Sequence, residues 1–466
     1  KRSMAEAAGV RVLDRLRVPP APPCPSADLP ITFFDAAWLF TGPVQRLFFY
    51  RHANPSAALP LLAASLPHAL ARFPPLAGTI SPAARRLSYS TAHDALHFVL
   101  AESTAPDDFD RFVAAGPRDL SLLRPLVPAL PPPGKDGAFA LAALQATVFP
   151  GRGVCVGVSV HHAACDDASA TLFVRTWAAA CRLRAPLDGA DHSEAVPPPP
   201  VLDRSLVADP DDLLGKTLAG MSRLASGPPP PPPQAQGPPP PQAQGPPPPS
   251  PVIASFALTR DQIDGIKDAA AAQGAPHMSS FVAASALAWV CLLRSRSAGV
   301  EGAARSHMLF SAECRSRLSP PLPAEYFGNC LRPCFVEAAT SDLMTTDDAG
   351  GVAVAAAAIG AAIREMERGV LEGAEGWLGQ VMSVLPQRPM SVGGSPRHGV
   401  YEGTDFGWGK PCRVDMVSTE MTPGTVSLAE SPDGLGGVEV GVVLPPDAME
   451  AFASCFAELL NNKKSV

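Results

Sequence analysis

Apolar and small residues alternate most regularly over residues 154–160, where every second position is valine. Alternation with a period of two predicts a β-strand. One face of this strand carries Val154, Val156, Val158, Val160 and, one step further, His162. Because that face is apolar up to the histidine, the imidazole of His162 is expected at the edge of a packed sheet, where a substrate channel could open.

Similar patterns divide the rest of the chain into strands and helices. In the first half, strands are predicted at residues 47–52, 96–100 and 139–148, with helices at 58–73 and after a cap at Asp166 or Asp167. In the second half, strands are predicted at 252–258, 307–312 and 437–444, and helices at 260–273, 279–293, 351–368 and 446–460. This mixture predicts an α/β protein with two similar halves.

A proline-rich tract separates the two halves. Residues 228–233 are all proline, and the octapeptide Gln-Ala-Gln-Gly-Pro-Pro-Pro-Pro then occurs twice, at 234–241 and 242–249. Such a sequence forms neither helix nor sheet and favours polyproline II. We interpret residues 206–251 as a crossover with a solvated insertion, between domains at 4–205 and 252–466. A docking site for an SH3-like or WW-like partner is the alternative.

Composition restricts the class of protein. The 466 residues are 46% hydrophobic and 17% charged, which indicates buried cores and not disorder. A net charge of -7 argues against a nucleic-acid partner. The ten cysteines have no paired zinc-type spacing and suit free thiols in a reducing compartment. Because no secretory signal or membrane-spanning run is found, we expect a cytoplasmic protein without a membrane partner.

The histidine at the strand end has the chemistry of a general base. An alcohol is a poor nucleophile at neutral pH, and imidazole has a pKa suited to removing its proton, so His162 is the candidate. Cys165 lies nearby but has no basic partner at a defined spacing, which disfavours a nucleophilic thiol. His161 points to the opposite strand face and is interpreted as structural. Two imidazoles on opposite faces cannot easily share an ion, so no metal site is expected.

Strings along nearly the whole chain are similar to those of one family. Residues 161–167 are His-His-Ala-Ala-Cys-Asp-Asp, and residues 405–409 are Asp-Phe-Gly-Trp-Gly. In this order and spacing they resemble the HxxxD and DFGWG motifs of the plant BAHD acyltransferases, which move an acyl group from coenzyme A to an alcohol or amine. Strings at 29–35, 43–50, 73–78 and 314–318 resemble further family landmarks, and Tyr-Phe-Gly-Asn-Cys at 326–330 resembles the YFGNC signature of the clade that acylates flavonoid and other phenolic glycosides.

This resemblance implies a fold and a reaction. Both halves would adopt the chloramphenicol-acetyltransferase-like fold with mixed sheets, and the active-site channel would run between them. The acceptor would attack acyl-CoA directly, with acyl-CoA as co-substrate and no bound cofactor. We expect a monomeric O-acyltransferase that acts on a hydroxyl of a phenolic or flavonoid glycoside. Malonyl-CoA is the first donor expected, followed by acetyl-CoA and hydroxycinnamoyl-CoA; a catalytically silent relative that acts through a protein partner is the alternative.

The resemblance also assigns roles within the HxxxD motif. Asp166 either touches His162 as a catalytic dyad or turns away to anchor the loop through an ion pair with Arg315 or Arg317, and the family favours the ion pair. At the next position the family usually has glycine, whereas this chain has Asp167. If that glycine has a positive φ, an aspartate there adds strain and affects turnover more than fold.

Three further groups of residues are candidates for supporting roles. The string at 405–409 is expected to form a structural turn beside the coenzyme channel through Asp405, Gly407, Trp408 and Gly409, with Trp408 as an oxyanion donor the alternative. Ser279 and Ser280 open a helix whose amides are candidates for binding a phosphate, although an ordinary cap explains them equally well. Arg175 is a candidate partner for a malonyl carboxylate, with a surface arginine the alternative.

Overall fold

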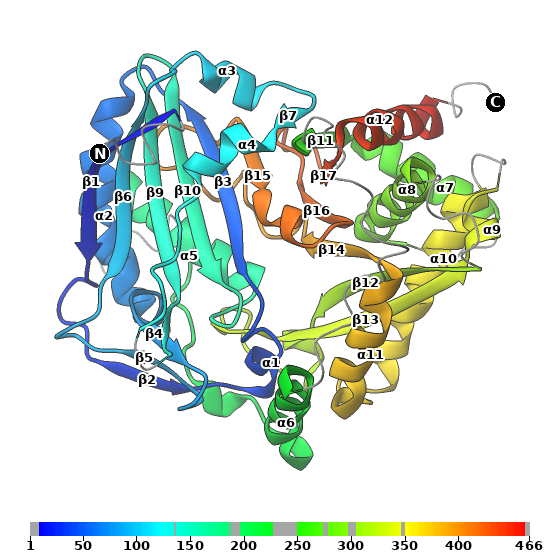
Figure 1. Ribbon diagram of the computed structural model, residues 1–466, viewed down its shortest axis with the longest axis horizontal. Coiled ribbons are helices and arrows are strands. Elements are labelled where there is room, and N and C mark those ends of the chain that lie inside the picture. The colour runs from blue at the N-terminus through cyan, green and yellow to red at the C-terminus, as the bar shows by residue number, and fades with distance from the viewer. Residues whose placement is uncertain are drawn as a thin grey trace, which may run out of the picture.

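Two large β-sheets lie side by side, the first formed mainly by the N-terminal half of the chain and the second mainly by the C-terminal half (Figure 1). The computed structural model describes residues 9–134, 137–185, 187, 196–226, 249–273, 278–296, 304–345 and 350–461. Helices pack against each sheet, which confirms the predicted α/β class in two halves. Residues 228–248 of the proline-rich tract lie outside the described residues, so its interpretation stays a prediction.

The first sheet has the strand order β1-β6-β9-β10-β3-β15. Its strands are β1 (Val10–Val18), β3 (Pro43–Arg51), β6 (Leu96–Ser103), β9 (Ala142–Phe149), β10 (Gly153–His161) and β15 (Arg413–Met416). β10 lies between β9 and β3, and every residue of both β9 and β10 is buried. A strand covered on both faces needs small or apolar residues at successive positions. The alternation of valine with small residues therefore marks the centre of a sheet.

One face of this sheet is covered by α2 (Ala58–Arg72) and α5 (Asp167–Leu183), which also pack against each other. Phe173 and Trp177 of α5 are fully buried in the core that these helices share with the strands. Burying one phenylalanine side chain contributes roughly 1.5–3 kcal/mol. The packing therefore fixes the helix that begins inside the HxxxD motif. The opposite face carries α3 (Asp108–Val113) and α4 (Leu120–Leu123).

The second sheet has the order β13-β12-β14-β16-β17-β11-β7. Its strands are β7 (Arg118–Asp119), β11 (Val252–Leu258), β12 (Arg305–Glu313), β13 (Leu331–Ala339), β14 (Met390–Gly394), β16 (Thr425–Glu430) and β17 (Val438–Leu444). Apart from β7, these strands share a second core with α7 (Arg260–Ala272), α8 (Ser280–Ser295), α10 (Gly350–Glu365) and α12 (Pro446–Asn461). A small sheet is formed by β2 (Ala27–Pro30), β4 (Thr79–Ser81), β5 (Arg86–Tyr89) and β8 (Phe139–Ala140). The other α-helices of the described residues are α1 (Phe33–Ala36), α6 (Leu213–Ser226), α9 (Thr340–Leu343) and α11 (Trp377–Val384).

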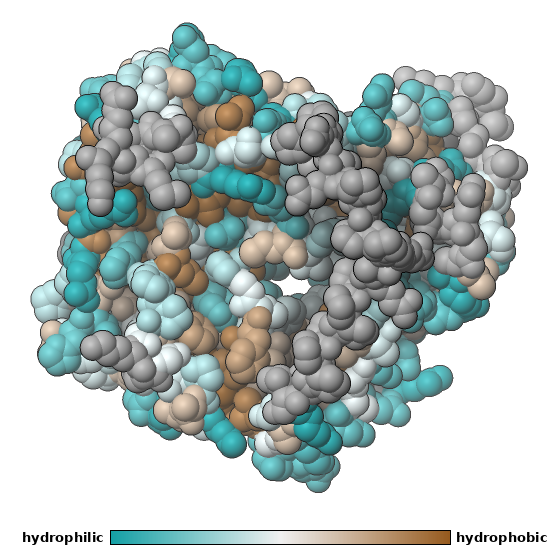
Figure 2. Space-filling view, in the orientation of Figure 1, coloured by the Kyte–Doolittle hydropathy of each residue, from teal (hydrophilic) through white to brown (hydrophobic). Residues whose placement is uncertain are grey.

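The two halves exchange short strands. β15 comes from the C-terminal half but pairs with β3 of the first sheet, and β7 comes from the N-terminal half but pairs with β11 of the second. The predicted domains at 4–205 and 252–466 do not include this exchange, because strands of two to four residues are too short to show periodicity. A cavity lies between the sheets, and Figure 2 shows the molecule hollowed near its centre.

Most predicted elements are present with shifted ends. The strand predicted at 252–258 coincides with β11, whereas the strand predicted at 139–148 is divided into β8 and β9. The helix predicted at 351–368 ends earlier, because α10 stops at Glu365 and a 3-10 turn follows. Neither α6 nor α11 was predicted. Long, strongly periodic segments were therefore the reliable part of the interpretation.

Candidate active site

His162 lies immediately after the end of β10 and is partly exposed. Its ring stacks on the indole of Trp38, with centroids 3.7 Å apart and an angle of 6° between the planes. Trp38 follows α1, so residues from both ends of the first half meet here. The stack holds the imidazole at a defined orientation at the edge of the sheet.

The side chain of Asn329 fixes the tautomer of His162. The amide nitrogen of Asn329 donates to Asp35 Oδ1 at 3.0 Å and to the backbone oxygen of His162 at 2.9 Å. The amide oxygen of Asn329 therefore faces His162 Nδ1, 3.2 Å away, and can only accept a hydrogen bond. Because Nδ1 must carry the proton, Nε2 has the free lone pair that a general base needs.

A buried ion pair supports this amide. Asp35 Oδ2 lies 2.7 Å from Arg204 Nη1, and both side chains are fully buried. Arg204 also donates to the backbone oxygen of Ala164 at 3.2 Å, inside the HxxxD motif. Sequence reasoning assigned no role to these residues. Asp35 and Asn329 lie in two of the strings that resemble family landmarks, so the resemblance could have indicated them. No feature of the sequence indicated a role for Arg204.

Burial lowers the pKa of His162, and the neighbouring charges of Asp166 and Asp167 and the hydrogen bond from Nδ1 to Asn329 oppose that shift. The lowered pKa favours the neutral imidazole of His162 at neutral pH. His161 has a different environment, because its ring packs on Phe139 with centroids 4.4 Å apart. Its Nδ1 accepts from the backbone N–H of Ala163, and burial lowers its pKa to about 4.

Asp166 turns away from the imidazole and pairs with Arg315. Arg315 Nη1 lies 2.8 Å from Asp166 Oδ2, and both side chains are almost completely buried. The other carboxylate oxygen caps α5 by accepting from the backbone N–H of Ser169 at 3.0 Å. Arg315 also donates to the backbone oxygens of Tyr326 and Gly328. The pair therefore joins the motif to the 326–330 segment. Arg317, the other candidate, is exposed and donates to the backbone oxygen of Glu313.

Asp167 is the first residue of α5, and its φ is not positive. The expected backbone strain is therefore wrong, because the position is helical and any residue tolerates it. Its carboxylate lies 2.9 Å from Arg46 Nη1 and 2.6 Å from His398 Nδ1. These two partners lower the pKa of Asp167 against the opposing effect of its burial.

The 405–409 segment forms a tight turn, which we call the DFGWG turn. Asp405 Oδ1 accepts from the backbone N–H groups of Gly407, Trp408 and Gly409, at 2.7, 3.0 and 2.9 Å. Gly407 and Gly409 have φ values of 100° and 88°, a region that strongly favours glycine. One carboxylate thus satisfies three consecutive donors, which explains why the turn needs an aspartate followed by glycines.

The aromatic rings of this turn pack far from His162. Phe406 and Trp408 both contact Tyr50 edge to face, at 5.6 Å. Tyr50 pairs with Val154 near the start of β10, whereas His161 at its end pairs with Pro43. Seven strand residues span roughly 23 Å. Trp408 is therefore too distant to donate to a reacting oxyanion, and that alternative is wrong.

Known proteins are similar to this chain over nearly its whole length. The model of the Transferase family matches residues 8–459. The chain belongs to the BAHD acyltransferases. An anthocyanin 5-O-glucoside malonyltransferase of Salvia splendens is 31% identical over 96% of this chain and 94% of its own length. An anthocyanidin 3-O-glucoside coumaroyltransferase of Arabidopsis thaliana is 33% identical over 94% of both chains. The crystal structure of vinorine synthase has a TM-score of 0.64 and 20% identity, and the match covers 97% of this chain and 98% of that one.

The family assignment confirms the predicted fold class and the acyltransferase activity, with acyl-CoA as co-substrate. The family assignment does not give the roles of individual residues, which depend on the geometry of the site. In this BAHD chain, Cys165 is buried and burial raises the pKa of its thiol well above the ordinary value, which disfavours a nucleophilic thiolate. Ser279 caps α8 by accepting from the backbone N–H of Val282, and Ser280 is the first residue of that helix. Phosphate binding there stays a prediction.

Arg175, the candidate for a malonyl carboxylate, lies two turns beyond Asp167 on the same face of α5, roughly 12 Å along the helix axis. Its guanidinium packs where a side chain at Gly403 would lie, and it does not line the cavity between the sheets.

Two further features are absent from the described ranges. No group of three His, Cys, Asp or Glu side chains within them could hold a metal ion. No helix within the same ranges is long and apolar enough to cross a membrane.

Proposed function

We propose that this BAHD member transfers an acyl group from coenzyme A to a hydroxyl of a phenolic or flavonoid glycoside, with His162 as the general base. The observation that carries the proposal is the Asn329 hydrogen bond, since it leaves His162 Nε2 unprotonated at the edge of the sheet. The acceptor class is supported by the relatives named above, both of which act on anthocyanin or anthocyanidin glucosides.

The reaction follows from this geometry. His162 Nε2 removes the proton of the acceptor hydroxyl while the oxygen attacks the thioester carbonyl carbon. The carbon–sulfur bond then breaks, and the imidazolium returns the proton to the departing thiolate of coenzyme A. Asn329 accepts from Nδ1 throughout and so stabilises the transient positive charge. Asp166 acts in this scheme as an anchor through its pair with Arg315.

The relatives leave the donor open. The YFGNC string favours malonyl-CoA, but relatives of similar identity are named as a malonyltransferase and a coumaroyltransferase. A malonyl group carries a second carboxylate, which would be strongly penalised in a buried site without a cation. The choice of donor therefore depends on the charges that line the site.

The function is tested by incubating the purified protein with malonyl-, acetyl- and coumaroyl-CoA and a panel of phenolic glycosides, with products identified by mass spectrometry. A glycoside whose mass increases by one acyl group is expected. Initial rates at varied concentrations of both substrates should give intersecting double-reciprocal lines, as direct transfer in a ternary complex requires. Parallel lines would indicate an acyl-enzyme, and the absence of any acylated glycoside would contradict the proposed acceptor class.

A further inference from the structure

Trp38 covers one face of the imidazole of His162. The two rings are nearly parallel, with centroids 3.7 Å apart and an angle of 6° between the planes. The lone pair of Nε2 lies in the plane of the imidazole ring, so an indole stacked on the face leaves the edge with Nε2 free. The indole can therefore act on the charge of the base without blocking the acceptor hydroxyl.

The indole is held in place by the turn that follows α1. The backbone N–H of Trp38 donates to the backbone oxygen of Asp35 at 3.0 Å, and its own backbone oxygen accepts from Thr41 Oγ1 at 2.9 Å. Asp35 Oδ2 in turn accepts from the backbone N–H and the hydroxyl of Thr32 at the start of α1. The indole itself packs against the core of the first half. Its position over the imidazole is therefore fixed by the fold.

The charged groups around the imidazole are already paired with one another. The pairs are Asp166 with Arg315, Asp167 with Arg46 and His398, and Asp35 with Arg204. Burial lowers the pKa of His162, and it lowers that of the adjacent His161 to about 4, so His161 adds no charge at neutral pH. Because a paired carboxylate attracts a further cation less than a free one, an uncharged contact matters more for the protonated form of His162.

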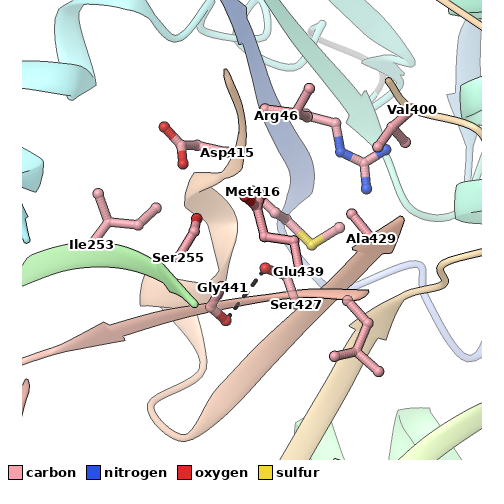
Figure 3. A pocket seen from close by; sticks show the side chains of 12 residues that line it. Arg46, Ile253, Ser255, Val400, Asp415, Met416, Ser427, Ala429, Glu439 and Gly441 are labelled. Carbon is pink, nitrogen blue, oxygen red and sulfur yellow. Dashed lines mark hydrogen bonds between the residues drawn. The ribbon is translucent and has the colours of Figure 1, made fainter. Parts of the chain in front are cut away.

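The cavity between the two sheets is separate from this stack. Figure 3 shows it lined by side chains such as Asp415 and Glu439, and neither Trp38 nor His162 is among its lining residues. Within the described residues, the direct polar and aromatic contacts of the imidazole therefore come from Asn329 at Nδ1 and from Trp38 on the ring face.

We propose that the indole of Trp38 stabilises the imidazolium that His162 becomes during acyl transfer, so that Trp38 is a positioning residue of the base. The inference rests on the proposed function, in which His162 holds the proton of the acceptor until the thiolate of coenzyme A takes it. The face of an indole is negative, so a cation centred over it within about 6 Å is attracted. The stacked imidazole meets this condition, and the attraction strengthens when the proton arrives, which favours the charged stage over the neutral ground state.

Trp38→Phe and Trp38→Leu form a graded pair, because phenylalanine keeps an aromatic face whereas leucine only fills space. The acidic limb of the kcat/KM profile reports the pKa of the base in the free enzyme. With leucine the limb should move to lower pH by about 0.5 to 1.5 pH units, and kcat should fall about 3- to 30-fold, the scale of a desolvated cation–π contact. The values for phenylalanine should lie between those for leucine and for the unmodified protein.

Trp377→Leu is the matched control. Trp377 is also partly buried, but its ring contacts Arg332 and not His162. Its acidic limb should coincide with that of the unmodified protein. The KM for the acceptor tests another role, because removing an indole that binds the aromatic ring of the acceptor would raise KM and leave the limb in place. Circular dichroism over the same pH range checks that each variant is folded.

The outcomes are distinct. A limb that stays in place in folded Trp38→Leu would overturn the inference, as would a raised KM with unchanged kcat or equal shifts for leucine and phenylalanine. If Trp38→Leu does not fold, Trp38→Phe should still move the limb to lower pH, and an unmoved limb there would overturn the inference. Absence of acyl transfer by the unmodified protein, or near-normal turnover in His162→Ala, would instead reject the proposed function.

Discussion

The candidate base site, which we define as Asp35, Asn329 and His162, and the DFGWG turn both contain an aspartate, but the two aspartates obtain their partners in different ways. At the base site, Asp35 binds Asn329, which lies 294 residues away, and Asn329 binds His162 across 167 residues. In the turn, Asp405 binds three N–H groups within four residues of itself. The base site therefore exists only when both halves of the chain have folded together, whereas the turn forms from its own sequence.

This difference indicates which residues act together. A change at the base site should affect catalysis and the contact between the two halves, because its hydrogen bonds join β10, α1 and the 326–330 segment. A change in the turn should affect local stability alone, because its rings pack on Tyr50 and Trp177 in the core of the first half. Four substitutions distinguish an effect on catalysis from an effect on local stability.

The largest effect is expected for His162→Ala. Loss of a general base should lower kcat by about two to four decades while the protein remains folded, because the side chain lies at the sheet edge. Steady-state kinetics and circular dichroism check both parts. His93→Ala is the matched control, since His93 is exposed. Near-normal turnover in the His162 variant would show that the base is elsewhere.

Asp166→Asn should reduce stability more than any other change proposed for the motif. Breaking its buried pair with Arg315 leaves the guanidinium with the partly exposed Glu313 as its carboxylate partner and costs about 3–5 kcal/mol of the free energy of unfolding. Chemical denaturation measures this loss, and Asp264→Asn, in an exposed ion pair, provides the control. An inactive variant that is as stable as the parent would instead support a catalytic dyad with His162.

Asn329→Ala tests how the tautomer is held. Removing the acceptor for His162 Nδ1 should lower kcat about 10- to 100-fold, since a hydrogen bond to a charged group contributes about 1.5–3 kcal/mol. The same bond favours protonated imidazole and so raises its pKa. In the variant the pKa of His162 should fall further, and the acidic limb of the kcat/KM profile should move to lower pH. A limb that stays in place would mean that Asn329 acts only through the fold.

Asp405→Ala should have the smallest effect of the four. The turn loses one acceptor for three N–H groups, a loss comparable to that of a helix cap, which costs about 1–2 kcal/mol. The melting temperature should therefore fall, while turnover well below that temperature is unchanged, because Trp408 packs far from His162. Lost turnover without lost stability would place Asp405 among the groups that act on the substrate.

The same comparison explains how much could be predicted. Strands with a clear local sequence pattern were predicted correctly. The alternation with a period of two predicted β10, and β11 coincides with the strand predicted at 252–258. The exchanged strands β7 and β15 were missed because neither has enough residues to repeat a pattern. Arg204 was missed for another reason, since nothing near it in the sequence indicates that it binds Asp35.

The α/β class, the strand that leads to His162 and the family could all be inferred from the amino-acid sequence, because they depend on periodicity and on short strings of residues. Three features required the folded structure: the free nitrogen of His162, the pairing of Asp166 with Arg315 and not with Arg317, and the pairing of Asp167 with Arg46 and His398. The physical reason is that pairing between charges and hydrogen-bonding groups depends on distance in space. No periodicity along the chain records that distance when the partners lie more than a hundred residues apart.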